Sequence, residues 1–141
     1  MNTFHLRVIK PEKVVYEAEV ISLSLPTSSG QVTVLANHEP MVMRVVTGEM
    51  VVRSLGDGGK EKEEPMAVAG GTVEIKKDEV VVLANRAEHV HELDIEKAKE
   101  ARTRIEGEIE KIKSDHASYE GLLQQLHKEH NRIKMYEKYR S

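Results

Sequence analysis

The sequence predicts a mainly β chain with an α-helical end: an antiparallel β-sandwich or barrel over residues 1–88, then an antiparallel helical hairpin over residues 89–141. Sixteen of the 17 valines, all four prolines and seven of the nine glycines lie in the first part. Apolar and polar residues alternate there with a period of two. Residues 89–141 instead carry 22 charged side chains, 11 of each sign, among good helix formers.

Six runs with a period of two predict strands in the first part: HLRVI, EAEVISLSL, QVTVL, VVRSL, TVEIKK and EVVVLAN. Turn-forming residues separate the runs at Pro11, Pro26, 29–30, Gly48, 57–59, 70–71 and 77–78. LGDGGKEKEE predicts an exposed hairpin loop, and AVAGGTVEI predicts a strand that bends at its paired glycines. Residues 28–30 are therefore expected to form a turn, 31–35 a strand, and 37–40 the loop at its far end.

Two helices are predicted from the spacing of apolar residues in the second part. Asp94 is placed to cap the first helix, and Lys97 stands where a capping box would have Glu or Gln. The stretch KSDHAS separates the helices. The apolar stripes comprise Ala98, Ala101, Ile105, Ile109 and Ile112 in the first helix, and Tyr119, Leu122, Leu123, Leu126, Ile133 and Tyr136 in the second.

Composition and charge argue against several classes of function. There are no cysteines, so disulfide and thiolate chemistry are excluded. The formal charge of −3 does not supply the basic surface that sequence-independent nucleic-acid binding needs. No apolar run has the length of a signal peptide or a membrane span, so we expect no direct insertion into a membrane.

Three stretches of the sequence stand out, in this order: LSLPTSSGQVTVLANHEPMVMRVVTGEMVV, AVAGGTVEIKKDEVVVLAN and LDIEKAKEARTR. Together they resemble the epsilon subunit of the bacterial F-type ATP synthase. They are similar to that family's strand with a glycine loop and a His-x-Pro corner, its paired-glycine strand with the last hairpin, and the start of its C-terminal helix. The resemblance covers essentially the whole chain.

The resemblance implies a rotor subunit of the central stalk that has no catalytic activity of its own and requires no cofactor. Its sandwich is expected to dock on the gamma subunit and the c-ring, and so to help couple proton flow to ATP synthesis. Its helices are expected to extend into the alpha/beta catalytic head and inhibit ATP hydrolysis. The expected location is the cytoplasmic face of the bacterial plasma membrane, as a peripheral subunit.

The resemblance also implies which residues meet these partners. The loop with Ser29, Gly30 and Gln31 corresponds to the family's loop that faces the c-ring. His38 and Pro40 correspond to the corner near the surface that meets gamma and the ring. The alternatives are purely structural roles. Gln31 is then a polar strand residue beside a turn, His38 bonds to the local backbone, and Pro40 fixes the backbone direction after the loop.

Some bacterial members bind ATP in the folded hairpin through a motif of the form I/L-D-x-x-R-A. Residues 93–98 keep the acid and the alanine of this motif but have lysine in place of arginine. Because lysine lacks the bidentate fork of arginine, the expected affinity for ATP as a regulatory ligand is reduced. The alternative is a capping Asp with solvated helix charges. The candidate ATP-binding residues are Glu88, Asp94, Lys97, Ala98, Arg104, Lys128 and Arg132.

A second class of function rests on histidines. Alternate histidines on a strand project to one side, so His38, His89 and His91 can be read as the ligands of a cupin-like metal-binding β-sandwich enzyme. His89 and His91, however, lie outside the predicted strand run. We therefore expect no metal site, and metal analysis of the purified protein separates the two interpretations.

Overall fold

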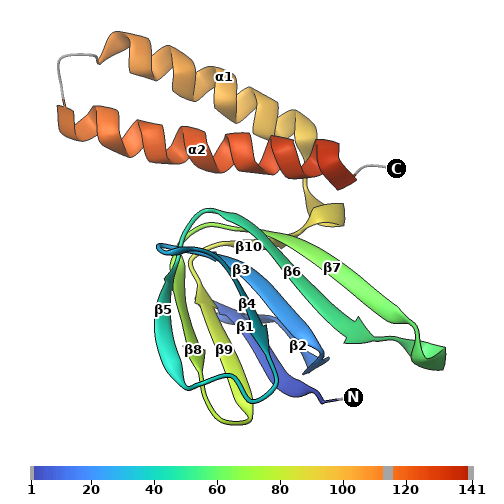
Figure 1. Ribbon diagram of the computed structural model, residues 1–141. Helices are drawn as coiled ribbons and strands as arrows, with labels where there is room; N and C mark the ends of the chain where they lie inside the picture. Colours follow the sequence, from blue (N-terminus) through green and yellow to red (C-terminus); the bar gives the residue numbers. More distant parts are fainter. Residues whose placement is uncertain (1, 113–115, 140–141) are drawn as a thin grey trace. The chain divides into compact units, whose positions relative to one another are not determined.

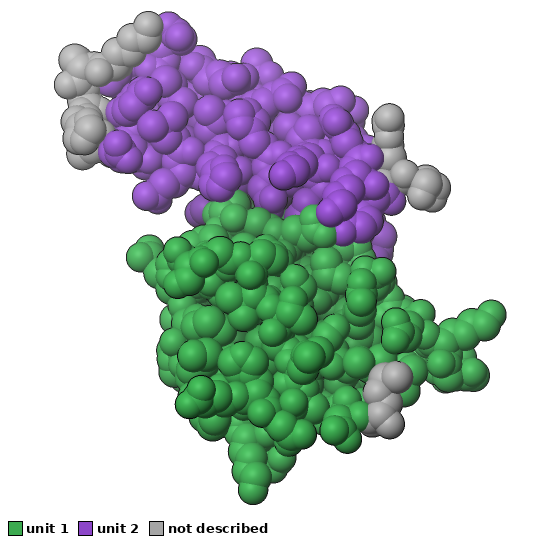
Figure 2. All heavy atoms as spheres, in the orientation of Figure 1, with its two compact units in different colours: residues 1–89 green, residues 90–141 purple. Residues whose placement is uncertain are grey.

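The computed structural model describes residues 2–112 and 116–139. The chain divides into two compact units, Met1–His89 and Val90–Ser141 (Figure 2). The sequence placed this division one residue earlier. None of the helices in the described residues is long and apolar enough to cross a membrane.

The first unit is a single ten-stranded sheet that folds over on itself into a sandwich close to a barrel (Figure 1). The hydrogen-bonded order is β10-β7-β6-β3-β5-β8-β9-β1-β2, and β4 pairs with β3 off this path. All pairs are antiparallel except β1 with β9. The strands are β1 Phe4–Lys10, β2 Lys13–Val20, β3 Ser22–Thr27, β4 Gly30–Leu35, β5 Met41–Val45, β6 Gly48–Leu55, β7 Glu61–Val68, β8 Gly71–Ile75, β9 Glu79–Ala84 and β10 Ala87–His89.

The core of this unit comes from the alternation that predicted the strands. Every second residue of β1 is buried, from Phe4 through Leu6 to Val8, and β8 alternates in the same way around Val73. The strand β9 buries three consecutive valines, 80–82. The buried cluster lies entirely within residues 4–87. The predicted β-sandwich is therefore confirmed, and it has a hydrophobic core of its own.

The predicted exposed hairpin loop is shorter in the structure. The strands β6 and β7 stay paired as far as Leu55 and Glu61, and the short 3-10 helix η1, Asp57–Gly59, makes the turn. The charged residues KEKE therefore belong mostly to β7. Charged side chains are tolerated there because this hairpin projects from the sandwich into solvent, and Arg53 lies 3.7 Å from Glu63 across the pair (Figure 1).

The paired glycines separate two strands, whereas the sequence predicts one strand that bends at them. The strand β7 ends at Val68, and β8 begins at Gly71 and pairs with β5 and β9. Gly70 and Gly71 have φ angles of 76° and 132°, which L-residues rarely adopt. The two glycines therefore let the chain leave β6–β7 and join a different part of the sheet.

The second unit is the predicted helical hairpin. It contains the 3-10 turn η2 Val90–Glu92, α1 Ile95–Lys111 and α2 His116–Tyr139. Asp94 caps α1, because its Oδ1 accepts the amide of Lys97 at 3.1 Å. The predicted stripe residues Ala98, Ile105 and Ile133 are buried, and α2 begins already at His116.

Candidate functional site

The turn between β3 and β4 exposes Ser29 and Gly30. Thr27 fixes its shape from within: the Oγ1 of Thr27 donates to the carbonyl of Gly30 at 2.7 Å and accepts the amide of Ser29 at 3.2 Å. Gly30 has a φ of 111°. This turn is a rigid tip whose outer residues are small, so a partner can approach its backbone closely.

Gln31, the first residue after this tip, is held by its own side chain. Its Nε2 donates to the Oγ of Ser24 at 2.9 Å and to the carbonyl of Glu49 at 3.1 Å. A partner that bonds to this nitrogen must replace both bonds. The local contacts favour the interpretation of Gln31 as a polar strand residue, while its exposure leaves a contact with a partner open.

The corner after β4 is fixed by backbone and histidine contacts. The amide of His38 donates to the carbonyl of Leu35 at 3.2 Å, and Asn37 has a positive φ of 66°. The Nδ1 of His38 lies 2.8 Å from the carbonyl oxygen of Glu39. Because a carbonyl can only accept, Nδ1 carries the proton, and Nε2 is the acceptor of the neutral ring. Pro40 is exposed beside it.

The predicted docking residues do not form one site. Gly30 and Leu35 are the two ends of β4, so the tip with Ser29–Gly30 and the corner with His38–Pro40 lie at opposite ends of this strand (Figure 1). At about 3.3 Å per residue, the strand separates them by roughly 17 Å. The structure therefore offers two contact regions.

Exposed apolar side chains lie on the outside of β1, β2, β5 and β9. We call this surface the outer apolar face and define it by Ile9, Val14, Val42 and Leu83. Ile9 pairs directly with Val14 on one side and with Leu83 on the other. Val14 is 49% exposed, Leu83 42% and Val42 67%. Val42 lies apart from this row, opposite Glu74 of β8. A row of apolar side chains with exposed ends marks an interaction surface.

Charged side chains border the outer apolar face. Arg7 bonds to Glu79 at 2.8 Å across β1 and β9. His5 contacts Glu17 at 2.7 Å and Glu19 at 3.2 Å across β1 and β2. The hydrogen bond to Glu17 is the main cause that raises the pKa of His5 above its ordinary value. This polar border resembles the rim of a protein interface around its apolar centre.

The nucleotide candidates of α1 lie along the helix from its first turn. Asp94, Lys97 and Arg104 are exposed, whereas Ala98 is 3% exposed and packs as part of the apolar stripe. The spacing of seven between Lys97 and Arg104 places both on one flank of the helix. The Oδ1 of Asp94 is already used by the cap.

The candidates of α2 are Lys128 and Arg132, four residues apart and so on one side of the helix. The Nη1 of Arg132 donates to both carboxylate oxygens of Glu129, at 2.9 and 3.2 Å. The side chains of this pair are 19% and 7% exposed, respectively. The sequence did not single out Glu129, since a lone Glu in a charged helix carries no signal.

The antiparallel hairpin places part of this set at a similar level along its axis. Lys97 lies 15 residues before Ile112, and Arg132 lies 16 residues after His116, so they are at nearly the same level along the two helices. Arg104 is eight residues before Ile112, about 12 Å along the axis from the level of Arg132. Lys97, Lys128 and Arg132 are therefore the cations placed closest to one level.

Glu88 belongs to the first unit. It is the middle residue of β10, pairs with Ala67 in the sheet, and its carboxylate lies 3.6 Å from the Nε of Arg86. Its predicted part in nucleotide binding stays a prediction.

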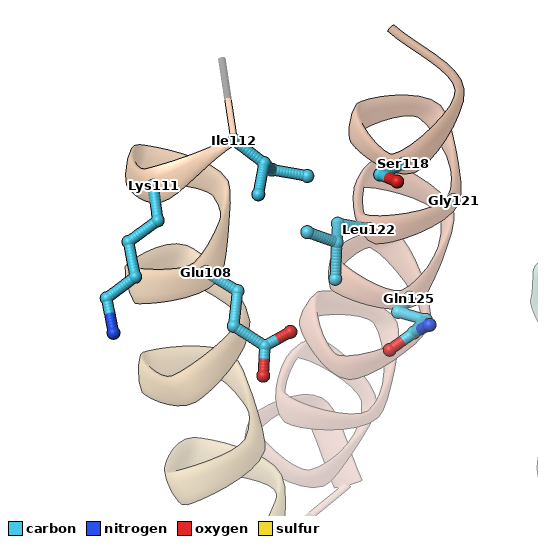
Figure 3. Close-up of a pocket in the computed structure, with 7 residues that line it drawn as sticks. All are labelled: Glu108, Lys111, Ile112, Ser118, Gly121, Leu122 and Gln125. Carbon is cyan, nitrogen blue, oxygen red and sulfur yellow. The ribbon is translucent and has the colours of Figure 1, made fainter. Parts of the chain in front are cut away.

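A pocket of about 540 Å³ lies between α1 and α2 near their connected ends (Figure 3). Ile112 and Leu122 face each other across it, and the carboxylate of Glu108 points into the space between the helices. Lys111, Ser118, Gly121 and Gln125 complete the lining. None of the candidate ATP-binding residues lines this pocket, so it is not the predicted nucleotide site.

The metal-binding alternative has no support. His38 bonds to local backbone, and the Nδ1 of His89 lies 3.7 Å from the carboxylate of Glu64 beside the ring of Tyr16. The strand β10 ends at His89 and a 3-10 turn follows, so His89 and His91 do not alternate on a strand. Within residues 2–112 and 116–139, no three His, Cys, Asp or Glu side chains form a group suited to a metal ion.

The family model of the ATP synthase delta/epsilon chain β-sandwich domain matches residues 3–90. The chain is 41% identical to the ATP synthase epsilon chain of Synechocystis over 105 residues, which are 74% of each protein. It is 37% identical to that of Moorella thermoacetica over 75% of this chain and 76% of the relative.

Solved structures give the same fold. A chain in the structure of the Euglena gracilis mitochondrial ATP synthase with OSCP, F1 and c-ring has a TM-score of 0.71 at 21% identity. The match covers 90% of this chain and 76% of that one. Since the family model matches more than half of the chain and the relatives match about three quarters of it, the chain belongs to the ATP synthase delta/epsilon chain family.

Proposed function

We propose that this chain is the non-catalytic central-stalk subunit of an F-type ATP synthase, and that its sandwich docks on the gamma subunit through the outer apolar face. The single observation that carries this proposal is the row Val14–Ile9–Leu83, which is continuous across three strands, with Val14 and Leu83 exposed to solvent and Ile9 half-buried between them. A rotor subunit that transmits torque needs a rigid surface fixed to the shaft. A sheet with its own core supplies that rigidity.

The second contact region is assigned to the c-ring. The tip with Ser29, Gly30 and Gln31 lies at the far end of β4 from His38 and Pro40. A protein between a shaft and a ring needs two separate contacts. His38 and Pro40 are grouped with the outer apolar face, because β5 leads directly from this corner to Val42.

This assignment places the chain on the cytoplasmic face of the bacterial plasma membrane, as a peripheral subunit that couples proton flow to ATP synthesis. The uncharged amide of Gln31 forms no ion pair. The contact between the tip and the ring is therefore expected to change little with salt concentration.

Two matched variants test the docking face. Val42→Glu and Leu83→Glu place a carboxylate on it, and Leu55→Glu does the same at an apolar position of the β6–β7 hairpin that is 45% exposed. Losing the burial of one such side chain costs about 2 kcal/mol, so each face variant should weaken binding to gamma by roughly 30-fold, measured by calorimetry. Equal weakening by Leu55→Glu, or wild-type affinity in both face variants, would contradict the proposal.

The helical unit is assigned the regulatory part. We expect it to inhibit ATP hydrolysis by entering the alpha/beta catalytic head. Both helices have thin apolar stripes and mostly exposed charged flanks, so the hairpin is held by modest burial, and a modest bias can release it. Truncation after residue 90 should then raise the ATPase activity of the assembled enzyme without preventing assembly. Unchanged hydrolysis across salt and nucleotide conditions would contradict this role.

ATP is the regulatory ligand proposed for the folded hairpin. The supporting observation is that Lys97 on α1 and Arg132 on α2 lie at one level. A ligand held by both helices selects the folded state, because extension separates its contacts. Titration of the full chain with ATP by calorimetry tests this: Lys97→Gln and Arg132→Gln should each weaken binding. If neither substitution changes the ATP affinity, the proposal is wrong, and Lys97 and Arg132 are solvated surface charges of the helices.

A further inference from the structure

Glu129 is a nearly buried carboxylate beside an arginine that the proposed nucleotide site requires. Both of its oxygens accept from the same nitrogen, the Nη1 of Arg132, at 2.9 and 3.2 Å. The Glu129 side chain is 7% exposed. Contacts of this geometry are charge-assisted hydrogen bonds, and they are stronger where water is excluded.

A phosphate and a carboxylate both accept hydrogen bonds from the N–H groups of a guanidinium. Each is a planar or branched group of acceptor oxygens that pairs with the N–H fork of arginine. Two of the contacts that Arg132 can donate already go to Glu129. A phosphate that takes these donors must displace the carboxylate, and one that binds beside them meets a like charge.

We propose that the carboxylate of Glu129 competes with the phosphates of a bound nucleotide for Arg132, and that it thereby lowers the affinity of this site for the nucleotide. The inference rests on the proposed binding of ATP to the folded hairpin. It names a residue that determines affinity and that no part of the predicted nucleotide motif contains. Lys97, Lys128 and Arg132, the candidate cations closest to one level along the hairpin, supply three positive charges, and Glu129 places a negative charge directly against Arg132.

The test compares ATP affinities of full-length variants. Glu129→Gln keeps the shape, the helix propensity and one acceptor oxygen for Arg132 but removes the negative charge. A carboxylate about 6 Å from a phosphate, at the effective dielectric of about 20 near a protein surface, corresponds to roughly 100-fold in affinity before screening by salt, so at least about tenfold tighter binding is expected in this variant. Glu137→Gln removes the same charge from an exposed position of α2 and should change affinity by less than about threefold.

A double-mutant cycle shows whether Glu129 acts through Arg132. Arg132→Gln and the double variant Glu129→Gln/Arg132→Gln complete the cycle. The tightening caused by Glu129→Gln should largely vanish when Arg132 is absent. A role in packing alone predicts the same change with and without Arg132. Thermal unfolding of each variant, followed by circular dichroism at a helical wavelength, checks that the hairpin remains folded.

The outcomes separate this inference from the proposed ATP site. Binding by Glu129→Gln where the wild type binds weakly or not at all, with loss of the gain in the double variant, supports both. Equal affinity of the wild type and Glu129→Gln overturns the role of Glu129 and leaves the ATP site standing. If neither protein binds at about 10 mM ATP, the ATP site is wrong and the inference falls with it. A gain that survives without Arg132 also overturns the inference.

Discussion

Replacing Gly71 by alanine should lower the free energy of unfolding of the sandwich far more than the same change at Gly70, its neighbour in sequence. A Cβ at Gly71 would overlap the carbonyl oxygen of Leu83 and lie 2.9 Å from the Cα of Ala84. Both of these are backbone atoms of β9, which pairs with β8 at this point. A Cβ at Gly70 would instead meet the side-chain nitrogen of Asn85 at 2.8 Å, and that side chain can rotate away.

The magnitudes follow from these contacts. At Gly70 the positive φ of 76° costs an alanine about 1–2 kcal/mol. At Gly71 the φ of 132° is less accessible, and the overlap forces β8 and β9 apart, so we expect a loss of about 4 kcal/mol or more. Stabilities of single domains are about 5–15 kcal/mol, so the second loss removes much of the total.

Urea unfolding of a fragment of residues 1–89 measures both losses. Tyr16 is the one tyrosine of this fragment and the chain has no tryptophan, so tyrosine fluorescence reports on the sandwich alone. The half-buried Tyr16 lies against the core, and its signal should change on unfolding. Equal destabilisation by the two substitutions, or a loss below about 1 kcal/mol for Gly71→Ala, would refute the reasoning from backbone overlap.

Three further outcomes are expected. Asp94→Ala should cost the helical unit about 1 kcal/mol and Asp94→Asn almost nothing, since Asn caps equally well, as read from thermal unfolding by circular dichroism. Gly121→Ala should stabilise α2 by about 1 kcal/mol in the same assay, because nothing lies within 4 Å of the added Cβ. Because Glu17 raises the pKa of His5 above 6.5 in the folded state, the contribution of His5 is complete below pH 6.5 and is lost as the pH rises through the raised value. His5→Gln should therefore flatten that part of the pH profile of the urea midpoint.

Features set by neighbours in sequence were predictable. The cap at Asp94 depends on an amide three residues away, and the tip at Ser29–Gly30 depends on Thr27. The alternation of β1 identified its buried side from the sequence alone. In each case the physical cause lies within one turn or one strand.

Features set by distant pairing were not predictable. The run EVVVLAN is expected to alternate with a period of two, but Val80, Val81 and Val82 are all buried in β9, whereas Leu83, which pairs with Ile9 of β1, is 42% exposed. Arg7 and Glu79, which border this face, are 72 residues apart in sequence. The pairing of Glu129 with Arg132 is local, yet its near burial depends on the packing of the folded chain.

The signal that would have revealed the outer apolar face is a departure from strict alternation. Val81, Val82 and Leu83 follow one another without a polar residue. A run of this kind means either burial on both sides or an apolar surface kept for a partner. The docking residues inferred from the family resemblance remain predictions, and they lie at the two ends of β4.

The central claim is that docking on gamma belongs to the sandwich unit and needs nothing from the helices. Calorimetric titration of a gamma subunit with residues 1–89 and with the full chain tests it most directly. Because the buried cluster lies within residues 4–87, the fragment should fold and bind gamma with an affinity within about threefold of the full chain. A fragment that is folded by circular dichroism yet fails to bind gamma would contradict the account.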